Sequence, residues 1–494
     1  MKRSVLKNVL LIGVGPHARR IYLPIMKKEG EIMGFEIKCI VDLELQKDVI
    51  GRYLRSNDIV VDECLFLNKT DAQIKNNKLS KVVIRTLDKI IEKYEIETVF
   101  ICTEPNSHVA YAIWALKNNL NVLMDKPISA PESLATKKSS VKKLLKDYEE
   151  IKELYKKQKI KKPNLVFELM TQRRYHFAFA RMQELILEVV RRTGVPITSF
   201  QTTHCDGQWR MPREIIEQDY HPYNQGYGKL LHSGYHAIDI MDFLTRKSYE
   251  QAGVANKEIE VVGNFIYPND FLAQIPLAEY EKLFGSDLPY RGYSETDIIG
   301  KFKKFGEIDA QIQTTYKDTK GRSITIGQFN LLHNSFSQRD WSEASGRDLY
   351  KGNGRIRHEL HYIVQGPFQT IMYESFQSEE ILNKSTNHSR IGGEYHLDIH
   401  VFRNSKIFKD WDSYKKYSFD DFNISFLRGY SRGHQEDARR ECIKNFLAAV
   451  SGNETILRSN ILDQDNSIKI ISSAYLSALN RKKYRNPLIK IRVA

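Results

Sequence analysis

Two glycines near the start of the chain have the spacing of a phosphate-binding turn. The segment VLLIGVGPHA places Gly13 and Gly15 directly after an apolar run, with Ala18 three residues further on. In a G-x-G-x-x-G/A pattern, the first glycine allows a tight turn and the second lets the backbone approach a pyrophosphate. The small third residue lets the following helix pack on the strand, and the start of that helix offers free N–H groups to the phosphates.

Asp42 extends this pattern from the phosphates to the ribose. It follows a second apolar run, Phe35 to Val41, and a carboxylate at this point hydrogen-bonds the ribose hydroxyls of a dinucleotide. The same negative charge repels a 2′-phosphate. The glycines and Asp42 together therefore predict that the chain binds NAD, with NADP less favoured.

These residues need a strand-turn-helix unit to hold them, and the first 130 residues alternate strand and helix patterns. Strands are predicted at Val9 to Ile12, Phe35 to Val41, Lys81 to Arg85, Thr98 to Cys102 and Val122 to Met124, and helices at 17–29 and 107–118. This alternation indicates βαβ units and a parallel sheet.

The pattern changes after Lys162, where apolar and polar residues alternate and few helices intervene. Strands are predicted at 165–170, 197–203, 258–266, 310–315, 323–332 and 369–376, helices at 178–192, 235–245, 434–451 and 465–481, and long loops at 270–305 and 337–360. Alternation of this kind is typical of a mainly antiparallel sheet with one exposed face.

The predicted fold class is therefore α/β: a Rossmann domain followed by an α+β domain with a large open sheet. The predicted parts are a Rossmann NAD-binding domain at 1–130, a lysine-rich helical connection at 131–165, an α+β substrate and oligomerisation domain with long insertions at 166–430, and C-terminal helices at 431–494.

The composition limits the class of protein. The 494 residues carry a net charge of +14, which favours anionic ligands. The lysines crowd a predicted helix between Lys137 and Lys162, which indicates a solvated helix face; without interleaved aromatic residues it does not predict a nucleic-acid partner. No apolar run is long enough for a membrane span. Five scattered cysteines predict neither disulfides nor a zinc site and favour a cytoplasmic location.

Four further motifs carry a family resemblance: ICTEPNSH (101–108), NVLMDKPI (121–128), QRRY (172–175) and GKLLHSGYHAIDIMDFL (228–244). In this order, and after the glycine motif, they resemble the glucose-fructose oxidoreductase / inositol dehydrogenase (Gfo/Idh/MocA) family. Asp125 stands where the family has glutamate. The resemblance covers roughly residues 5–245 and a C-terminal helical region, while 246–425 contains no motif that can be placed.

The resemblance implies a cofactor site and a catalytic lysine. The implied cofactor-binding residues are Gly13, Gly15, Pro16, His17, Ala18, Asp42, Thr103, Pro105, Asn106, His108, Asp125 and Lys126. The family's lysine at the position of Lys126 lies beside the nicotinamide, where a cation stabilises negative charge on the reacting oxygen.

The resemblance also implies that His236 exchanges the hydroxyl proton, a role suited to an imidazole that titrates near neutrality. His232 is the third residue predicted to be catalytic, and it stands where the family usually has aspartate. It could hydrogen-bond the substrate, another acid such as Asp239 or Asp206 could supply the charge, or the reaction could differ. Two histidines at i and i+4 also have metal-ligand spacing, but no carboxylate or cysteine completes a site, so no metal is predicted.

Four residues are predicted to bind substrate: Arg173, Arg174, Tyr235 and Asp239. The arginines could grip a hydroxyl pair, a carboxylate or a phosphate, or form a surface pair.

The predicted function is hydride transfer between NAD(P) and a secondary alcohol or ketone of a sugar, an inositol or a sugar derivative. The net positive charge favours an anionic substrate of this kind. The substrate is expected between the parallel sheet and the antiparallel sheet, with the chain assembled as a homo-oligomer. Two alternatives stay open: a redox-neutral glycosidase or eliminase with tightly bound NAD, and a non-catalytic NAD-binding regulatory protein.

Overall fold

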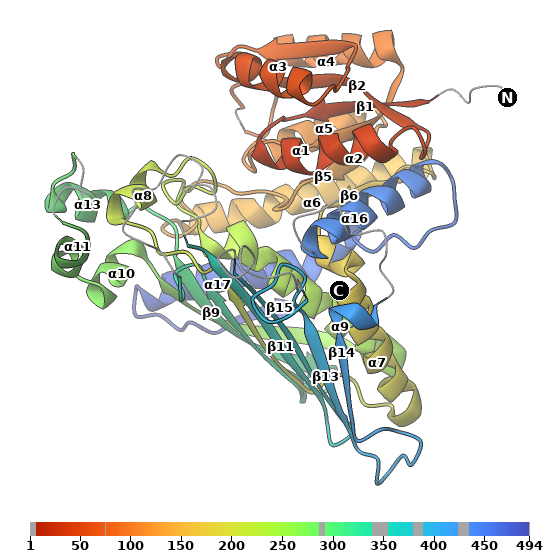
Figure 1. Cartoon of the computed structure of the whole chain (residues 1–494), viewed down its shortest axis with the longest axis vertical. Coiled ribbons are helices and arrows are strands. Elements are labelled where there is room, and N and C mark those ends of the chain that lie inside the picture. Colours follow the sequence, from red (N-terminus) through yellow and green to blue (C-terminus); the bar gives the residue numbers. More distant parts are fainter. Residues whose placement is uncertain are drawn as a thin grey trace. The chain divides into compact units, whose positions relative to one another are not determined.

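The computed structural model describes residues 6–74, 76–285, 292–337, 354–378, 389–422 and 434–493. The chain packs as two compact units (Figure 1). Unit 1 contains Met1–Ala130, Leu144–His176 and Gln435–Asp465, and unit 2 contains Pro131–Lys143, Phe177–His434 and Asn466–Ala494. These units cut across the domain limits expected from sequence, because segments far from the first 130 residues pack into unit 1.

Unit 1 is built on a six-stranded sheet with the order β3-β2-β1-β4-β5-β6, in which all neighbours pair in parallel. The strands are β1 (Lys7–Ile12), β2 (Phe35–Leu43), β3 (Glu63–Leu67), β4 (Ile96–Ile101), β5 (Asn121–Met124) and β6 (Phe167–Leu169). The parallel order confirms the predicted Rossmann fold, and it places the carboxyl ends of all six strands at one edge.

The helices of unit 1 include one that corrects the sequence-based assignment. They are α1 (Pro16–Arg20), α2 (Tyr22–Glu29), α3 (Lys47–Ser56), α4 (Lys81–Tyr94), α5 (His108–Lys117) and α16 (His434–Val450), with α6 (Lys138–Lys161) running through both units. The strand predicted at Lys81 to Arg85 is wrong, because this segment begins α4. Ser80 caps the helix by accepting from Val83 N at 3.2 Å, and Val83, Leu87 and Ile90 are buried at helical spacing.

Unit 2 contains a nine-stranded, mainly antiparallel sheet with the order β14-β13-β12-β11-β7-β10-β9-β8-β15. Its strands are β7 (Ser199–Cys205), β8 (Asn256–Ile266), β9 (Asp309–Asp318), β10 (Ser323–Leu332), β11 (Ile356–Gln365), β12 (Gln369–Ser378), β13 (Asp398–Arg403), β14 (Tyr414–Ser418) and β15 (Ile489–Arg492). Among the named strands that the structure describes in this sheet, β7 and β10 pair in parallel and the other neighbours pair antiparallel. Burial alternates along β9, β10 and β12, so one face is covered and the other is open, as predicted.

The helices of unit 2 are α7 (Phe177–Thr193), α8 (Pro212–Glu217), α9 (Tyr235–Ala252), α10 (Pro268–Gln274), α11 (Leu277–Phe284), α13 (Glu295–Phe302) and α17 (Asp465–Arg481). The long loop predicted at 270–305 is therefore wrong over α10, α11 and α13. The loop predicted at 337–360 ends where β11 begins, and residues 338–353 of it lie outside the described residues.

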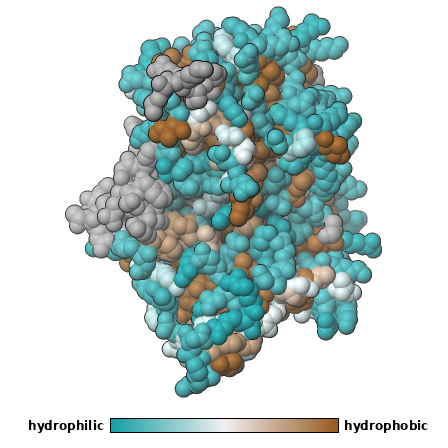
Figure 2. Space-filling view, turned by 90° about the vertical axis from the view of Figure 1, so that its right-hand side faces the viewer, coloured by the Kyte–Doolittle hydropathy of each residue, from teal (hydrophilic) through white to brown (hydrophobic). Residues whose placement is uncertain are grey.

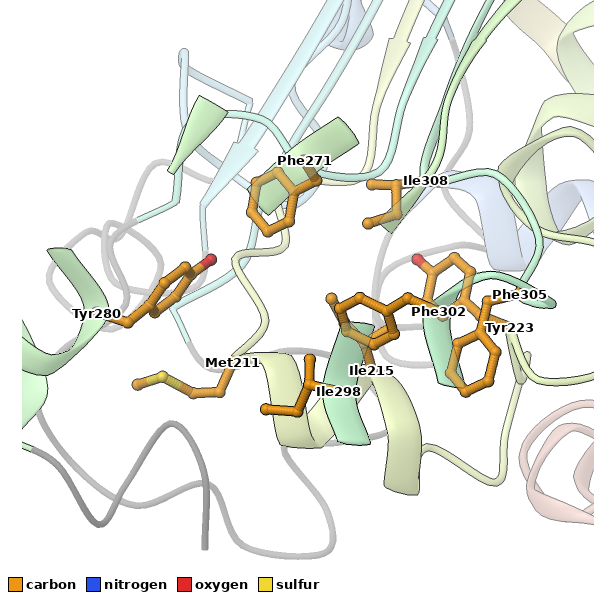
Figure 3. Packing of buried hydrophobic residues seen from close by; sticks show 9 residues of the cluster. All are labelled: Met211, Ile215, Tyr223, Phe271, Tyr280, Ile298, Phe302, Phe305 and Ile308. Carbon is orange, nitrogen blue, oxygen red and sulfur yellow. The ribbon is translucent and has the colours of Figure 1, made fainter. Parts of the chain in front are cut away.

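A separate hydrophobic cluster holds the short helices α8, α10, α11 and α13 together (Figure 3). Its buried members are Met211, Ile215, Tyr223, Phe271, Tyr280, Ile298, Phe302, Phe305 and Ile308. Each helix is too short to be stable alone, so their shared apolar contacts stabilise the group.

The face of the molecule in Figure 2 is predominantly hydrophilic, and its hydrophobic side chains form small separate patches. Among the described residues, no helix is both long enough and apolar enough to cross a membrane.

Candidate cofactor and catalytic site

Gly13 occupies a turn that no other residue fits. Its φ is +89°, a left-handed conformation that favours glycine. A Cβ at this position would lie 2.6 Å from the backbone carbonyl carbon of Cys102 and 2.7 Å from the nitrogen of Thr103. The absent side chain therefore lets β1 turn into α1 directly beside the end of β4.

Gly15 differs because a Cβ there would meet nothing within 4 Å. It is the N-cap of α1, which begins at Pro16 and buries Ala18 against the unit. The first turn of a helix has N–H groups without intrahelical partners, and open space at its start suits a phosphate. The residues present thus fit the pyrophosphate of a dinucleotide.

The carboxylate of Asp42 stands beside this turn, at the end of β2. Its Oδ2 accepts from Val14 N at 2.6 Å and its Oδ1 accepts from Leu43 N at 2.6 Å. Burial raises the pKa of Asp42, and the two backbone donors and the charge of Arg19 oppose that rise. Each carboxylate oxygen has a second lone pair, so the group fits the ribose hydroxyls of the same dinucleotide.

The segment after β4 is fixed to the segment after β5 by His108. This buried ring places Nδ1 2.7 Å from the carbonyl oxygen of Pro127 and Nε2 2.9 Å from that of Thr103. Burial lowers the pKa of His108 to about 4, and the two carbonyls act to raise it. His108 therefore connects two loops of the cofactor edge, and Pro105 and Asn106 lie in the first of them.

Lys126 lies near three other predicted cofactor residues. Its positive charge acts to lower the pKa values of His17, His108 and Asp125. Asp125 accepts from the hydroxyl of Tyr22 at 2.5 Å. Burial raises the pKa of Asp125 to about 6, with Tyr22 and Lys126 opposing. Burial also keeps the pKa of His17 well below its usual range, so its 3.8 Å approach to Asp125 is not an ion pair.

The two predicted catalytic histidines lie in unit 2, where a π-helical turn, η3 (Leu230–Gly234), leads into α9. His232 is within the turn and His236 is the second residue of α9; both are buried. The carboxylate of Glu307 stabilises this turn by accepting a hydrogen bond from Leu230 N at 2.9 Å. Gly228 is required there, since a Cβ would lie 1.8 Å from the carbonyl oxygen of Glu307.

A buried ion pair adjoins the same turn. Lys229, which has no exposed surface, donates to Asp206 and lies 2.9 Å from Nδ1 of His204. Asp206 also accepts from Ser233 Oγ at 2.6 Å and from Arg355 at 3.1 Å. Burial is the largest influence on the pKa of Asp206 and acts to raise it, but the charges of Lys229, His204, His333 and Arg355 together hold that pKa well below its usual range.

Sequence reasoning named Asp206 but did not assign Lys229 or Arg355. In the sheet, β7 lies between β10 and β11, and the end of β7 approaches the start of β11. The strand pairing brings Asp206 to Arg355, whereas Lys229 comes from the residue before η3, where its backbone N–H donates to the carbonyl oxygen of Glu307. No local spacing in the sequence encodes this meeting.

The four predicted substrate residues are all buried. Arg174 donates to the carbonyl oxygen of Arg458 at 2.8 Å within unit 1, and its neighbour Arg173 lies on the same short helix, η2 (Gln172–Tyr175). In unit 2, Asp239 lies 3.4 Å from Ser467 Oγ, and Tyr235 packs in the interior. Contact of these residues with a substrate stays a prediction. In the described parts of the chain, no three His, Cys, Asp or Glu side chains are placed to hold a metal ion.

Comparison with known proteins gives a family match over the N-terminal part of the chain. Residues 7–151 match the Gfo/Idh/MocA family model, described as an oxidoreductase family with an NAD-binding Rossmann fold. This match confirms the resemblance predicted from sequence, and it places the chain among NAD(P)-dependent oxidoreductases. A sequence search of curated proteins gives no match.

Solved structures of three proteins illustrate the similarity of fold. An oxidoreductase from Agrobacterium radiobacter, in complex with NAD+, L-tartaric acid and magnesium, has 13% identity and a TM-score of 0.55, with 99% of this chain and 98% of that chain covered. Levoglucosan dehydrogenase in complex with NADH and levoglucosan has 13% identity, a TM-score of 0.53 and 99% of both chains covered. Myo-inositol 2-dehydrogenase from Lactobacillus plantarum has 12% identity, a TM-score of 0.51, and coverage of 99% and 100%. At these identities the similarity shows the fold alone.

Proposed function

We propose that the chain transfers hydride between NAD and a secondary alcohol or ketone of a sugar, an inositol or a sugar derivative. The observation that carries this proposal is the cofactor edge of unit 1, where the space at Gly15, the start of α1 and the carboxylate of Asp42 fit one dinucleotide. NAD is preferred to NADP because Asp42 would repel a 2′-phosphate. When bound, the nicotinamide supplies the hydride acceptor or donor.

Lys126 is proposed to stabilise the reacting oxygen. Its ammonium follows β5 at the edge where α/β sheets bind ligands, and its charge already acts on His17, His108 and Asp125. A cation at this point stabilises the alkoxide character that develops as a carbon–hydrogen bond breaks.

His236 is proposed to take up or return the hydroxyl proton, since an imidazole exchanges protons in both directions near neutral pH. The small polyhydroxylated compounds bound by the levoglucosan and tartrate structures suggest substrates of that size. A homo-oligomer is also proposed: the open sheet face exposes Ile326, Tyr362 and Phe402, and light scattering on the purified protein would measure its mass.

The experiment starts with the purified protein, from which any bound nucleotide is released by denaturation and identified by mass spectrometry. NAD(H) and NADP(H) affinities are then measured, followed by NADH formation with a panel of sugars and inositols. Lys126→Ala should lower kcat at least 100-fold with little change in NAD affinity, whereas Lys89→Ala, an exposed lysine on α4, should change neither.

Three outcomes would count against the proposal. No affinity for either dinucleotide would contradict the cofactor site. A stoichiometric NAD that never exchanges, with no net NADH, would favour the redox-neutral alternative. Full activity in Lys126→Ala would remove the lysine from the mechanism.

A further inference from the structure

His232 is at the centre of a group of aromatic rings in unit 2. Four rings lie around it: His221 with centroids 4.8 Å apart, Tyr223 at 5.4 Å, Tyr227 at 5.6 Å and His333 at 6.1 Å. Three of them meet His232 nearly edge to face, with interplanar angles of 67–73°. His221 alone is parallel to it, at 9°.

The backbone that carries His221 is held in an unusual conformation. Its φ is +52°, in the left-handed region that side chains other than glycine rarely adopt. The side-chain amide of Gln218 donates to the carbonyl oxygens of both Tyr220 and His221, each at 2.7 Å. The ring of Tyr220 stacks in turn on that of His221, with centroids 4.2 Å apart. Strained backbone persists where its surroundings determine it, and it clusters at functional sites.

Both ends of this loop are anchored in the hydrophobic cluster of Figure 3. The helix before the loop, α8, contributes Ile215, and the residue that closes it, Tyr223, lies in the same cluster close to Phe305. The carbonyl oxygen of Tyr223 accepts from Gly226 N at 2.9 Å and from Gly306 N at 2.8 Å. The loop from 218 to 222 is therefore short and fixed at both ends, so the position of His221 is well defined.

We propose that His221 is a positioning residue for His232, a claim that deepens the proposed function. The terminal torsion of a histidine side chain is broad, so the rings packed against a buried imidazole help to set its orientation. The parallel ring of His221 fixes the plane of His232 and covers it, since His221 is partly exposed whereas His232 is buried. The stacked geometry therefore suits a role in which His221 orients and shields His232.

Three substitutions of His221 distinguish the contribution of its ring from that of its backbone conformation. His221→Asn keeps a residue that tolerates left-handed φ but removes the ring. His221→Phe and His221→Tyr keep a planar ring but remove the imidazole. All variants are first compared with the native protein for thermal unfolding and NAD affinity, neither of which should change greatly.

The first readout needs no substrate: the rate at which diethyl pyrocarbonate modifies His232, mapped by peptide mass spectrometry. His221→Asn should raise this rate at least fivefold, and the Phe and Tyr variants should stay within twofold of the native rate. The second readout is turnover: His221→Asn should lower kcat at least tenfold with the KM for NAD within threefold, while at least one ring variant restores kcat to within threefold.

Unchanged modification of His232 in His221→Asn would overturn the inference. So would equal loss of kcat in all three folded variants, because the imidazole and not the stacked ring would then be required. If the native protein turns over no polyol but the modification pattern is as expected, the positioning of His232 stands and the proposed function fails.

Discussion

Asp42 shows how one side chain can serve both the fold and the ligand. Its two carboxylate oxygens bind the backbone of Val14, within the phosphate turn, and of Leu43, at the end of β2. The group that would select the ribose therefore also shapes the turn that would hold the pyrophosphate. The fingerprint and the acid are coupled by a hydrogen bond, although 28 residues separate Val14 from Asp42.

Substitution of Asp42 should change both cofactor affinity and selectivity. Asp42→Ser should raise the Kd for NAD by roughly 10–100-fold, because hydrogen bonds to a charged group are worth about 1.5–3 kcal/mol. The Kd for NADP should rise less, because the variant no longer repels the 2′-phosphate. Arg19, whose charge acts on Asp42, remains to attract that phosphate. Titration by calorimetry measures both constants. Asp48→Ser, on the surface of α3, is the matched control, and an equal loss of NAD and NADP affinity would contradict the selectivity argument.

At the scale of elements, β6 is a strand of only three residues, Phe167–Leu169, held by contacts from distant segments. Glu168 at its centre accepts from the hydroxyl of Tyr175 at 2.6 Å and from Ser459 N at 3.2 Å, and Leu169 N donates to the carbonyl oxygen of Ser459. These bonds attach the segment near residue 459 to the edge of the parallel sheet, which explains why it belongs to unit 1.

Glu168 should make unit 1 less stable as the pH rises. Burial raises its pKa to about 8, so between the ordinary pKa of 4.5 and 8 the folded state holds a proton that the unfolded chain releases. Stability is therefore lost across this window by up to about 1.4 kcal/mol per pH unit. Glu168→Gln imitates the protonated form, so its unfolding temperature relative to the native protein should climb from pH 5 to pH 8. Calorimetry at a series of pH values tests this. Glu92→Gln, on the surface of α4, is the control: its unfolding temperature should differ from that of the native protein by the same amount at every pH. If Glu168→Gln also showed a difference independent of pH, the raised pKa of Glu168 would be disproved.

The elements that sequence predicted well are those with a local signal. Gly13, Gly15 and Asp42 follow apolar runs, and the strands and helices around them lie close to their predicted positions. The prediction of a strand at Lys81 to Arg85 failed because three consecutive β-branched residues, 82–84, resemble a strand. The helical spacing becomes visible only over 81–94 together with its cap, Ser80.

The prediction of a loop at 270–305 failed for a different reason. The apolar residues of these short helices come together only in the folded cluster. Local signals were available: Ser294 and Asp297 form a capping box at the start of α13, and Pro268 and Asp270 stand in the first turn of α10. The charges around Lys229 and the rings around His232 have no such signal. They come from segments that only the fold places together, so the residues proposed to be catalytic could be named from sequence and their surroundings could not.

At the scale of the whole molecule, the cofactor domain is not continuous in the sequence. Helix α16 packs into unit 1 more than 300 residues after the glycine motif, with Phe446 6.0 Å from Phe100 of β4 and Arg440 paired with Glu29 of α2. Strand β4 leads into the loop at Thr103, which is part of the proposed cofactor site. By packing against β4, α16 therefore stabilises the strand that positions this loop.

Two variants that each create a cavity, one in each unit, should therefore differ in their affinity for NAD. Phe446 in unit 1 and Phe329 in unit 2 are both fully buried, and replacing either with alanine should cost about 3–5 kcal/mol of stability. At a temperature where both variants remain folded, Phe446→Ala should weaken NAD binding at least fivefold, since β4 loses its packing partner. Phe329→Ala, whose ring packs on Phe200 within the antiparallel sheet, should bind NAD as the native protein does. Equal NAD affinity in the two variants would show that α16 contributes to stability without shaping the cofactor edge, and weaker binding in Phe329→Ala would show that the dinucleotide site extends into unit 2.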